Sequence, residues 1–397
     1  MELQQPIRDL KAHVAHDDGQ FETLLIQSLK SARQQAEQSL EPALFEALEW
    51  PQTLEQYCRY LEKYLRWVPS QSGDSVWQNP DSESQGFHEL ADRLSHFFWL
   101  INQKVGPDDN TISEHVDWFH GWLVDCSRCW GDFLDTPESF SQDVLNSFMR
   151  YAPQYRIEES LVDGRPNSPS GWHTFNQFFA RRLNPGLRPI SAPNDNRIVT
   201  CPADSNYKQK FDITADSAIP GATIKRTHRY SDIQKLLEGS RYAKSFANGT
   251  FVHYCLPPYA YHHYHTPVAG RVQECYQLDG GVYMGVAIKE GRFDSQDRSQ
   301  SGFEFHQARG ILTLDTTESE CGNLGIVAVI PVGMGHVSSV NMTVVEGSLL
   351  RKGDEFGYFL FGGSDIIVLF QEGVATQVDE SSAYRLFGTV MAHCQAR

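Results

Sequence analysis

Residues 359–370 read FLFGGSDIIVLF, two apolar runs on either side of a Gly-Gly-Ser-Asp joint. The apolar runs are rich in residues that favour β-strands, and the paired glycines are typical of a turn between them. A serine that follows glycine on a tight backbone can also attack the carbonyl before it, so that the acyl chain moves from nitrogen to oxygen. The segment therefore predicts two strands joined by a turn, and it leaves a reactive bond between Gly363 and Ser364 as an open alternative.

Similar strand-like runs, punctuated by glycine and proline, continue through the second half of the chain. They are residues 249–255, 281–288 and 325–330. Such runs are typical of a β-rich domain, whereas the first part of the chain has little glycine and carries apolar side chains at helical spacing. The pattern predicts an α+β protein with a helical N-terminal domain over residues 1–164, followed by a β-rich, barrel-like domain over residues 165–397.

The composition narrows the range of partners. The chain has 50 Asp and Glu against 34 Lys and Arg, a formal net charge of −16, which disfavours nucleic acids and anionic membrane surfaces. No signal-peptide core is visible, and no apolar stretch approaches the ~20 residues of a transmembrane helix. The eight cysteines form no compact framework and are expected to be reduced thiols. We expect a cytoplasmic protein with no nucleic-acid partner and no membrane association, and the oligomeric state stays open.

Residues 259–267, YAYHHYHTP, place three histidines within four positions. In an extended strand His263 and His265 share one face, while His262 points to the other. Two histidines on one face, with a carboxylate, could bind zinc or iron. One imidazole could instead act as a general base near neutral pH. A polar-aromatic turn without chemistry is the third interpretation, and the residues alone leave all three open.

Four segments, in this order, resemble the phosphatidylserine decarboxylase family. They are residues 174–183 (TFNQFFARRL) with 188–190 (RPI), residues 202–204 (PAD), residues 261–267 (YHHYHTP) with Gly270, and residues 352–359 (KGDEFGYF) leading into residues 362–364 (GGS). Residues 332–338 are a partial counterpart of the family's Gly-x-x-x-Gly-Ser segment. The resemblance implies that residues 165–397 form a catalytic domain that cuts itself between residues 363 and 364.

The resemblance also implies a role for each matching residue. Ser364 would be cleaved from Gly363 and converted to a covalent pyruvoyl group, which replaces pyridoxal phosphate as the cofactor. His265 and Asp204 would form a triad with Ser364, in which a base activates a hydroxyl and a carboxylate orients the base. His262 would act in the decarboxylation itself, at protonation of the carbanion. The cleaved C-terminal fragment would remain a partner of the larger piece.

Asp365 departs from the family, which usually has threonine after the serine. If ionised beside the reactive group, Asp365 would attract a substrate ammonium and disfavour a phosphate, and it is our candidate for substrate selectivity. It could instead turn outward and stabilise the turn. Asp365 thus favours a small substrate that carries both an amine and a carboxylate, such as a free, aromatic amino acid, and the acidic net charge favours the same choice. The long helical N-terminal region also resembles that of the tryptophan-type amino-acid decarboxylases that branch from this family. Phosphatidylserine is the alternative substrate.

Two other classes of function remain as alternatives. One is a metal-dependent β-barrel enzyme that uses His263, His265 and Asp204. The other is a non-catalytic carrier or interaction module, because residues 347–370 have the glycine-rich strand rhythm of lipoyl-type barrels and a fold alone never proves activity.

Overall fold

The computed structural model describes residues 3–78, 88–106, 110–168, 170–219, 232–295, 307–335, 339–361 and 363–396. The chain forms two compact units. Unit 1 consists of Met1–Glu158, Gly171–Phe178 and Gly281–Asp297. Unit 2 consists of Glu159–Ser170, Phe179–Gly280 and Arg298–Arg397. Helices dominate the first unit and strands the second, which confirms the predicted α+β class.

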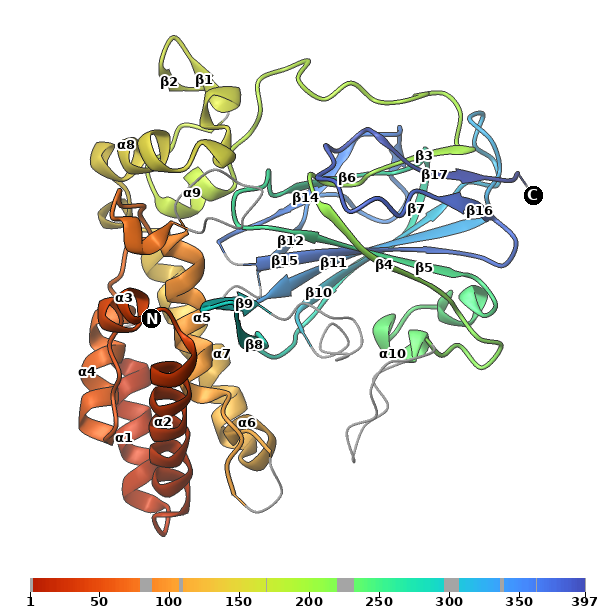
Figure 1. Ribbon diagram of the computed structural model, residues 1–397. Coiled ribbons are helices and arrows are strands. Elements are labelled where there is room, and N and C mark those ends of the chain that lie inside the picture. The colour runs from red at the N-terminus through yellow and green to blue at the C-terminus, as the bar shows by residue number, and fades with distance from the viewer. Residues whose placement is uncertain are drawn as a thin grey trace. The chain divides into compact units, whose positions relative to one another are not determined.

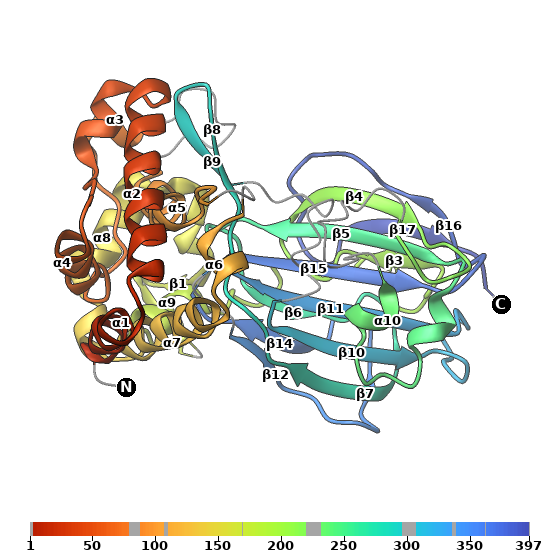
Figure 2. The ribbon, with the colours of Figure 1, turned by 90° about the horizontal axis from the view of Figure 1, so that it is seen from below.

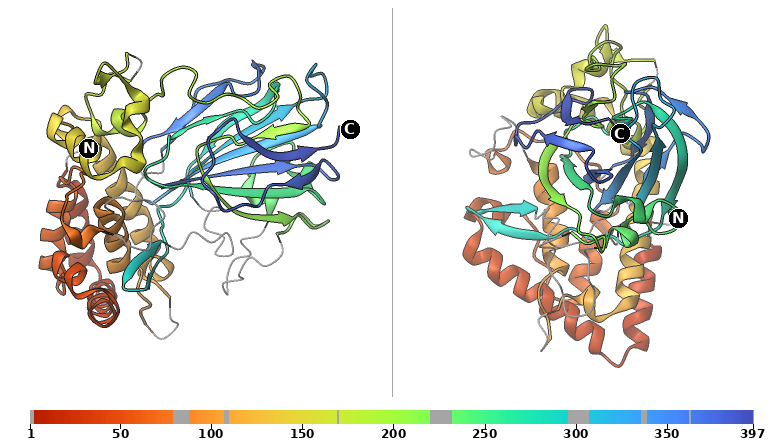
Figure 3. Two further views of the ribbon diagram at one scale, coloured as in Figure 1. Left: turned by 45° about the horizontal axis from the view of Figure 1, so that its top comes forward. Right: turned by 90° about the vertical axis from the view of Figure 1, so that its right-hand side faces the viewer.

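The longer helices of unit 1, within residues 5–134, pack against one another (Figure 3). The helix bounds in unit 1 are α1 (Gln5–His16), α2 (Gln20–Ser39), α3 (Pro42–Ala47), α4 (Leu54–Tyr64), α5 (Glu89–Ile101), α6 (Ile112–His115), α7 (Asp117–Leu134), α8 (Gln142–Tyr151) and α9 (Phe175–Phe179), whose last residue belongs to unit 2. The start of α4 shows how the sequence defines them, because the Thr53 side chain accepts a hydrogen bond from the Gln56 N–H at 3.2 Å. Tyr57 and Leu61 of α4 then lie on its buried face. No helix within the described ranges is long and apolar enough to cross a membrane.

Residues 281–288 differ from the prediction. Only Val286–Lys289 form a strand, β8, which pairs with β9 (Arg292–Ser295) as a hairpin of unit 1. The turn residues Glu290 and Gly291 both have positive φ, the conformation of a type I′ turn in a two-residue hairpin. Arg292 then donates to Asp92 of α5 at 2.6 Å, so the hairpin is held by the helices.

Unit 2 is built on a seven-stranded antiparallel sheet (Figure 1). In spatial order its strands are β13 (Leu349–Leu350), β7 (Gly270–Leu278), β10 (Arg309–Asp315), β11 (Ile326–Met334), β15 (Gly363–Phe370), β5 (Thr250–Leu256) and β4 (Asn206–Asp212). Two three-stranded sheets accompany it, formed by β12 (Val340–Met342), β14 (Glu355–Phe359) and β6 (His263–His265), and by β16 (Ala375–Val378), β17 (Val390–Cys394) and β3 (Ile198–Thr200). A small hairpin joins β1 (Leu161–Val162) and β2 (Arg165–Pro166). The described strands form open sheets, so the barrel-like closure that we expected is not found.

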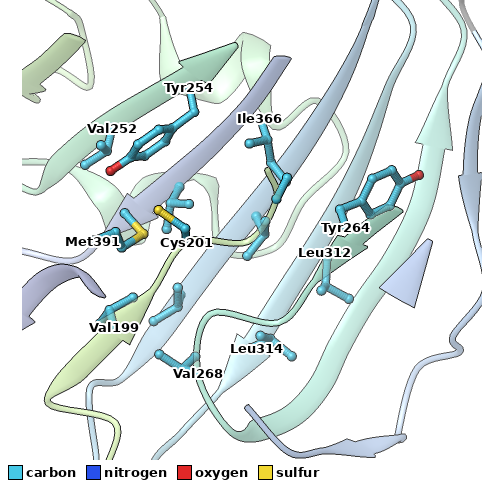
Figure 4. Packing of buried hydrophobic residues seen from close by; sticks show 14 of the residues in the cluster. Val199, Cys201, Val252, Tyr254, Tyr264, Val268, Leu312, Leu314, Ile366 and Met391 are labelled. Atoms are coloured by element: carbon cyan, nitrogen blue, oxygen red, sulfur yellow. The ribbon is translucent and has the colours of Figure 1, made fainter. Parts of the chain in front are cut away.

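The two faces of the large sheet bury different cores, because successive side chains of a strand point to opposite faces. One face carries Ile366 of β15 and Tyr254 of β5, which pack with Cys201 and Met391 (Figure 4). The opposite face carries the alternate residues, among them Ile367. That face is covered by the short helix α10 (Ile233–Leu236), which lies in front of the sheet in Figure 2.

The predicted turn at residues 362–365 lies elsewhere. β14 ends at Phe359 and β15 begins at Gly363, so the joint between the two strands is at residues 360–362, and Gly362 itself lies outside the described residues. Ser364 and Asp365 are strand residues, and β15 pairs with a neighbour on each side. The alternation of a strand therefore governs where their side chains point.

Candidate active site

Ser364 lies at the second position of β15, in the interior of unit 2. Its register partners are Gly333 of β11 and Leu256 of β5, and its side chain lies on the sheet face that carries Ile366. The residue is only 1% exposed. Within the described part of the chain, its Oγ has no hydrogen-bond partner. A buried hydroxyl normally has a partner, so this one is available for another interaction.

His265, at the end of β6, has a defined tautomer. Its Nδ1 lies 2.8 Å from the carbonyl oxygen of Gly353, which can only accept, so Nδ1 carries the proton. Nε2 is then the acceptor, and the Tyr261 hydroxyl donates to it at 3.3 Å. Burial lowers the pKa of His265 to about 4. The ring is therefore neutral near pH 7 and has its basic nitrogen at Nε2.

His262 precedes β6 and is fully buried. Its ring stacks on Phe179 with the ring centroids 3.9 Å apart, and Phe361 contacts the same Phe179 edge-on at 5.1 Å. Burial, with the positive charge of Arg181, holds the pKa of His262 well below its ordinary value. Neither ring nitrogen meets a hydrogen-bond partner among the described residues. His262 is thus a neutral imidazole linked by Phe179 to the segment just before the Gly363–Ser364 bond.

Asp204 follows β3 and forms its hydrogen bonds with residues other than His265, the expected partner. Arg188 Nη2 donates to its Oδ2 at 2.7 Å, and Arg188 Nε lies 3.1 Å from Oδ1. The backbone N–H of Phe387 donates to Oδ1 at 2.8 Å. Burial raises the pKa of Asp204, and Arg188 opposes this rise. None of these hydrogen bonds goes to His265, so the direct Asp204–His265 contact that a triad implies is absent from the described residues.

Asp365 occupies the sheet face opposite to Ser364. Its Oδ2 lies 3.1 Å from Nε2 of His253 in β5, and both side chains are fully buried. The carboxylate therefore neither faces the Ser364 hydroxyl nor turns outward, which corrects both alternatives drawn from the sequence. The placement gives no support to Asp365 as the residue that selects the substrate.

The model of the phosphatidylserine decarboxylase family matches residues 175–390, more than half of the chain. The chain belongs to the phosphatidylserine decarboxylase family. The matched range contains every site residue discussed above. It also covers most of unit 2.

Three curated relatives of two kinds illustrate the similarity. Phosphatidylserine decarboxylase proenzyme 2 of Oryza sativa subsp. japonica is 29% identical over 250 residues, which are 63% of this chain and 36% of the relative. Phosphatidylserine decarboxylase proenzyme 3 of Schizosaccharomyces pombe is 35% identical over 251 residues, 62% of this chain and 23% of the relative. Decarboxylase iboD of Amanita muscaria is 27% identical over 265 residues, 61% of this chain and 73% of the relative. The matched region thus spans 36% and 23% of the two proenzymes.

His263, which the metal-dependent alternative uses together with His265, has other partners. His263 Nε2 donates to the carbonyl oxygen of Ala180 at 2.9 Å, and its Nδ1 lies 3.2 Å from Glu355, whose carboxylate also binds Arg182. Among the residues that the structure describes, no group of three or more His, Cys, Asp or Glu side chains could hold a metal ion. The metal alternative gains no support from this geometry.

Several residues of the site had no role in the sequence analysis. Arg188 and Tyr261 stood inside quoted motifs, which gave a signal for their presence but not for their partners. Phe387 and His253 carried no signal, because their contacts join segments far apart in the chain.

The pair of Asp365 and His253 predicts a loss of stability in Asp365→Thr. Removing one member of a buried pair typically costs about 3–5 kcal/mol, because the other member is left without compensation. Urea unfolding of the uncleaved Ser364→Ala chain measures the loss. We expect the double variant His253→Leu/Asp365→Thr to recover part of it, since coupled sites are not additive. The matched control is Asp212→Thr at an exposed position of β4, expected within about 0.5 kcal/mol of the parent. Equal losses at the two positions would contradict the pairing.

Proposed function

We propose that this protein is a self-cleaving decarboxylase whose catalytic pyruvoyl group derives from Ser364. One observation carries the proposal: Ser364 directly follows Gly363 in β15, with a buried hydroxyl that has no partner among the described residues. A hydroxyl that must attack the preceding carbonyl has to be free of competing hydrogen bonds. Membership of the family supports the reaction class.

The residues present fit a pyruvoyl group. Such a group retains the three carbons of the serine, so it can occupy the space of Ser364 without displacing the neighbouring strands. Its ketone would supply an electron sink for the loss of CO2 from the substrate. The chain's own contribution is the low-polarity surrounding, since the same sheet face carries Ile366 and Tyr254.

The two histidines fit different tasks. We assign self-cleavage to His265, whose Nε2 carries the lone pair that a general base needs and would have to exchange its hydrogen bond with Tyr261 for one with Ser364. We assign the decarboxylation step to His262, whose ring nitrogens have no partner among the described residues and can meet a substrate. Being neutral, His262 can either donate or accept a proton.

For the substrate we propose a free amino acid, with an aromatic one as the first to test, and a cytoplasmic location. The net charge of −16 supports this choice, because it opposes docking on an anionic lipid surface. Phosphatidylserine is the second candidate, and the names of two relatives favour it. Both molecules present an ammonium and a carboxylate on one carbon, so the pyruvoyl chemistry would serve either.

Mass spectrometry and CO2 release test the proposal on the purified protein. We expect a C-terminal piece of 34 residues, Ser364 to Arg397, that begins with a pyruvoyl group. We also expect labelled CO2 from at least one carboxyl-labelled free amino acid and none from phosphatidylserine in mixed micelles. The Ser364→Ala chain is the control and should release none. Release from phosphatidylserine alone would overturn the substrate, whereas an uncleaved chain without release would overturn the function.

A further inference from the structure

The C-terminal segment of the chain reaches His265 through Phe387. The two rings are stacked with their centroids 3.8 Å apart and their planes within 1° of parallel. Phe387 is only 9% exposed. After a cut between Gly363 and Ser364, Phe387 belongs to the C-terminal piece and His265 to the larger one. One face of the imidazole is therefore covered by the same piece that carries Ser364.

The backbone of Phe387 is held by Asp204. The Phe387 N–H donates to Asp204 Oδ1 at 2.8 Å. The other contacts of this carboxylate are with the guanidinium of Arg188, which also donates to Glu159 at 2.7 Å. The side chains of Arg188 and Asp204 are 4% and 2% exposed. The buried ion pair thus fixes a carboxylate whose remaining hydrogen bond goes to Phe387.

The residues on either side of Phe387 are fixed as well. The N–H of Arg385 donates to the carbonyl oxygen of Ser205 at 2.8 Å, and the N–H of Gly388 donates to that of Cys201 at 3.0 Å. These bonds join the segment to the chain on both sides of Asp204. The backbone of Phe387 therefore cannot move away from His265 unless several of these hydrogen bonds break.

The edge of His265 is fixed by different groups. Gly353 accepts from Nδ1, and the preceding residue, Lys352, donates from Nζ to three backbone carbonyls. Tyr261 donates to Nε2. Gly353 and Tyr261 therefore set the rotation of the ring in its own plane, whereas Phe387 sets the tilt of that plane.

We infer that Phe387 is a positioning residue for His265, and that Asp204 acts on His265 through Phe387 rather than by direct contact. The inference rests on the proposed function, because it assigns the reason why Asp204 matters for self-cleavage. It also gives the C-terminal piece a second contribution to the site, in addition to the strand that begins with Ser364.

Substitutions at Phe387 give the first test. Chains made by cell-free synthesis are sampled over time on a denaturing gel for the appearance of the 34-residue piece. Phe387→Leu should slow cleavage roughly two- to tenfold, the range that an aromatic pair contributes. Phe387→Tyr keeps the stacked ring and should restore the rate. The matched control is Phe246→Leu, a buried phenylalanine packed on the opposite sheet face, which should leave the rate unchanged.

Substitutions at Asp204 separate the two modes of action. Asp204→Asn keeps an oxygen that can accept from the Phe387 N–H, whereas Asp204→Ala does not. If Asp204 acts through Phe387, Asn should be milder than Ala, and Asp204→Ala with Phe387→Leu should be no slower than Asp204→Ala alone. Equal damage from Asn and Ala, with additive effects in the double variant, would show that the charge acts directly and would overturn the inference.

A spectroscopic readout keeps the test independent of cleavage. In the Ser364→Ala chain, the ring-proton signal of His265, assigned with His265→Gln, should lie upfield because of the Phe387 ring current. In Phe387→Leu it should move downfield, and the pKa of His265 should rise toward its ordinary value, because burial is what lowers it. The groups that face His265, namely Tyr261, His263, Glu355 and Arg182, are the same in both chains.

The readouts distinguish this inference from the proposed function. If the wild-type chain never cleaves, the function fails, and the signal of His265 still shows whether Phe387 stacks on it. If the wild-type chain cleaves but Phe387→Leu changes neither the rate nor the signal, the function stands and the inference is wrong. If Phe387→Leu does not fold, the comparison of Asp204→Asn with Asp204→Ala decides.

Discussion

Ser364→Ala should yield a single chain of 45.0 kDa on a denaturing gel, with no 34-residue piece and no pyruvoyl group. This is the largest effect that we expect, because the proposed reaction takes its attacking oxygen from Ser364 itself. In the proposed self-cleavage, Ser364 Oγ attacks the Gly363 carbonyl, and the acyl chain moves from nitrogen to oxygen. Elimination then breaks the Cβ–Oγ bond of Ser364, so that the larger piece leaves with Oγ in its new carboxylate, and water releases the Ser364 nitrogen as ammonia to give the pyruvoyl group. Alanine has no oxygen to attack with, so the loss is complete rather than partial. Decarboxylation is lost with it, since the cofactor is never formed.

A serine elsewhere in the C-terminal piece controls for the substitution itself. Ser382 is exposed, and Ser382→Ala should cleave at the wild-type rate. The intact masses of the pieces from both variants identify the bond that is cut. A Ser364→Ala chain that still splits between residues 363 and 364 would show that another group attacks, and the assignment of Ser364 would be wrong.

Two strands of unit 2 could be predicted from the sequence, because local sequence patterns determine them. The runs at residues 249–255 and 325–330 became β5 and β11, which flank β15 in the sheet. Alternating apolar residues bounded by glycine are sufficient for a strand. For residues 281–288 the prediction was right only in part, because the strand covers only the end of the run and forms a hairpin of unit 1 with residues close to it in the chain.

The direction of the Asp365 side chain was missed for a local reason. The glycines before Ser364 suggested a turn as far as residue 365, whereas the strand already begins at Gly363. In a strand, neighbouring side chains take opposite faces, so Asp365 had to point away from Ser364. A shift of two residues in the position of the joint therefore reversed the conclusion about this carboxylate.

The partner of Asp204 could not have been predicted from the sequence. Its choice between His265, Arg188 and the backbone of Phe387 depends on how three distant segments pack. The motifs identify the residue types, but a buried carboxylate takes the donors that the fold brings closest. The sequence therefore identified the site residues but not the contacts between them.

The second large effect concerns His262. His262→Ala should permit cleavage between Gly363 and Ser364 but reduce the turnover of the mature protein ~10²–10⁴-fold, the range of general acid–base catalysis. The reason is geometric: His262 stacks on Phe179, and both of its ring nitrogens lack a partner among the described residues, so they can serve a substrate. The gel measures cleavage, and release of labelled CO2 measures turnover.

Further variants test whether His262 acts in decarboxylation and His265 in self-cleavage. His262→Leu keeps an apolar side chain against Phe179 without any ring nitrogen, so it should cleave like His262→Ala and be equally slow in turnover. The exposed His393→Ala is the matched control and should behave as the wild type. His265→Ala should instead slow the cleavage itself, because it removes the basic Nε2. If His262→Ala and His265→Ala impair cleavage equally, both rings act in maturation, and His262 cannot be assigned to decarboxylation alone. If His262→Leu turns over normally, packing rather than proton transfer is what His262 contributes.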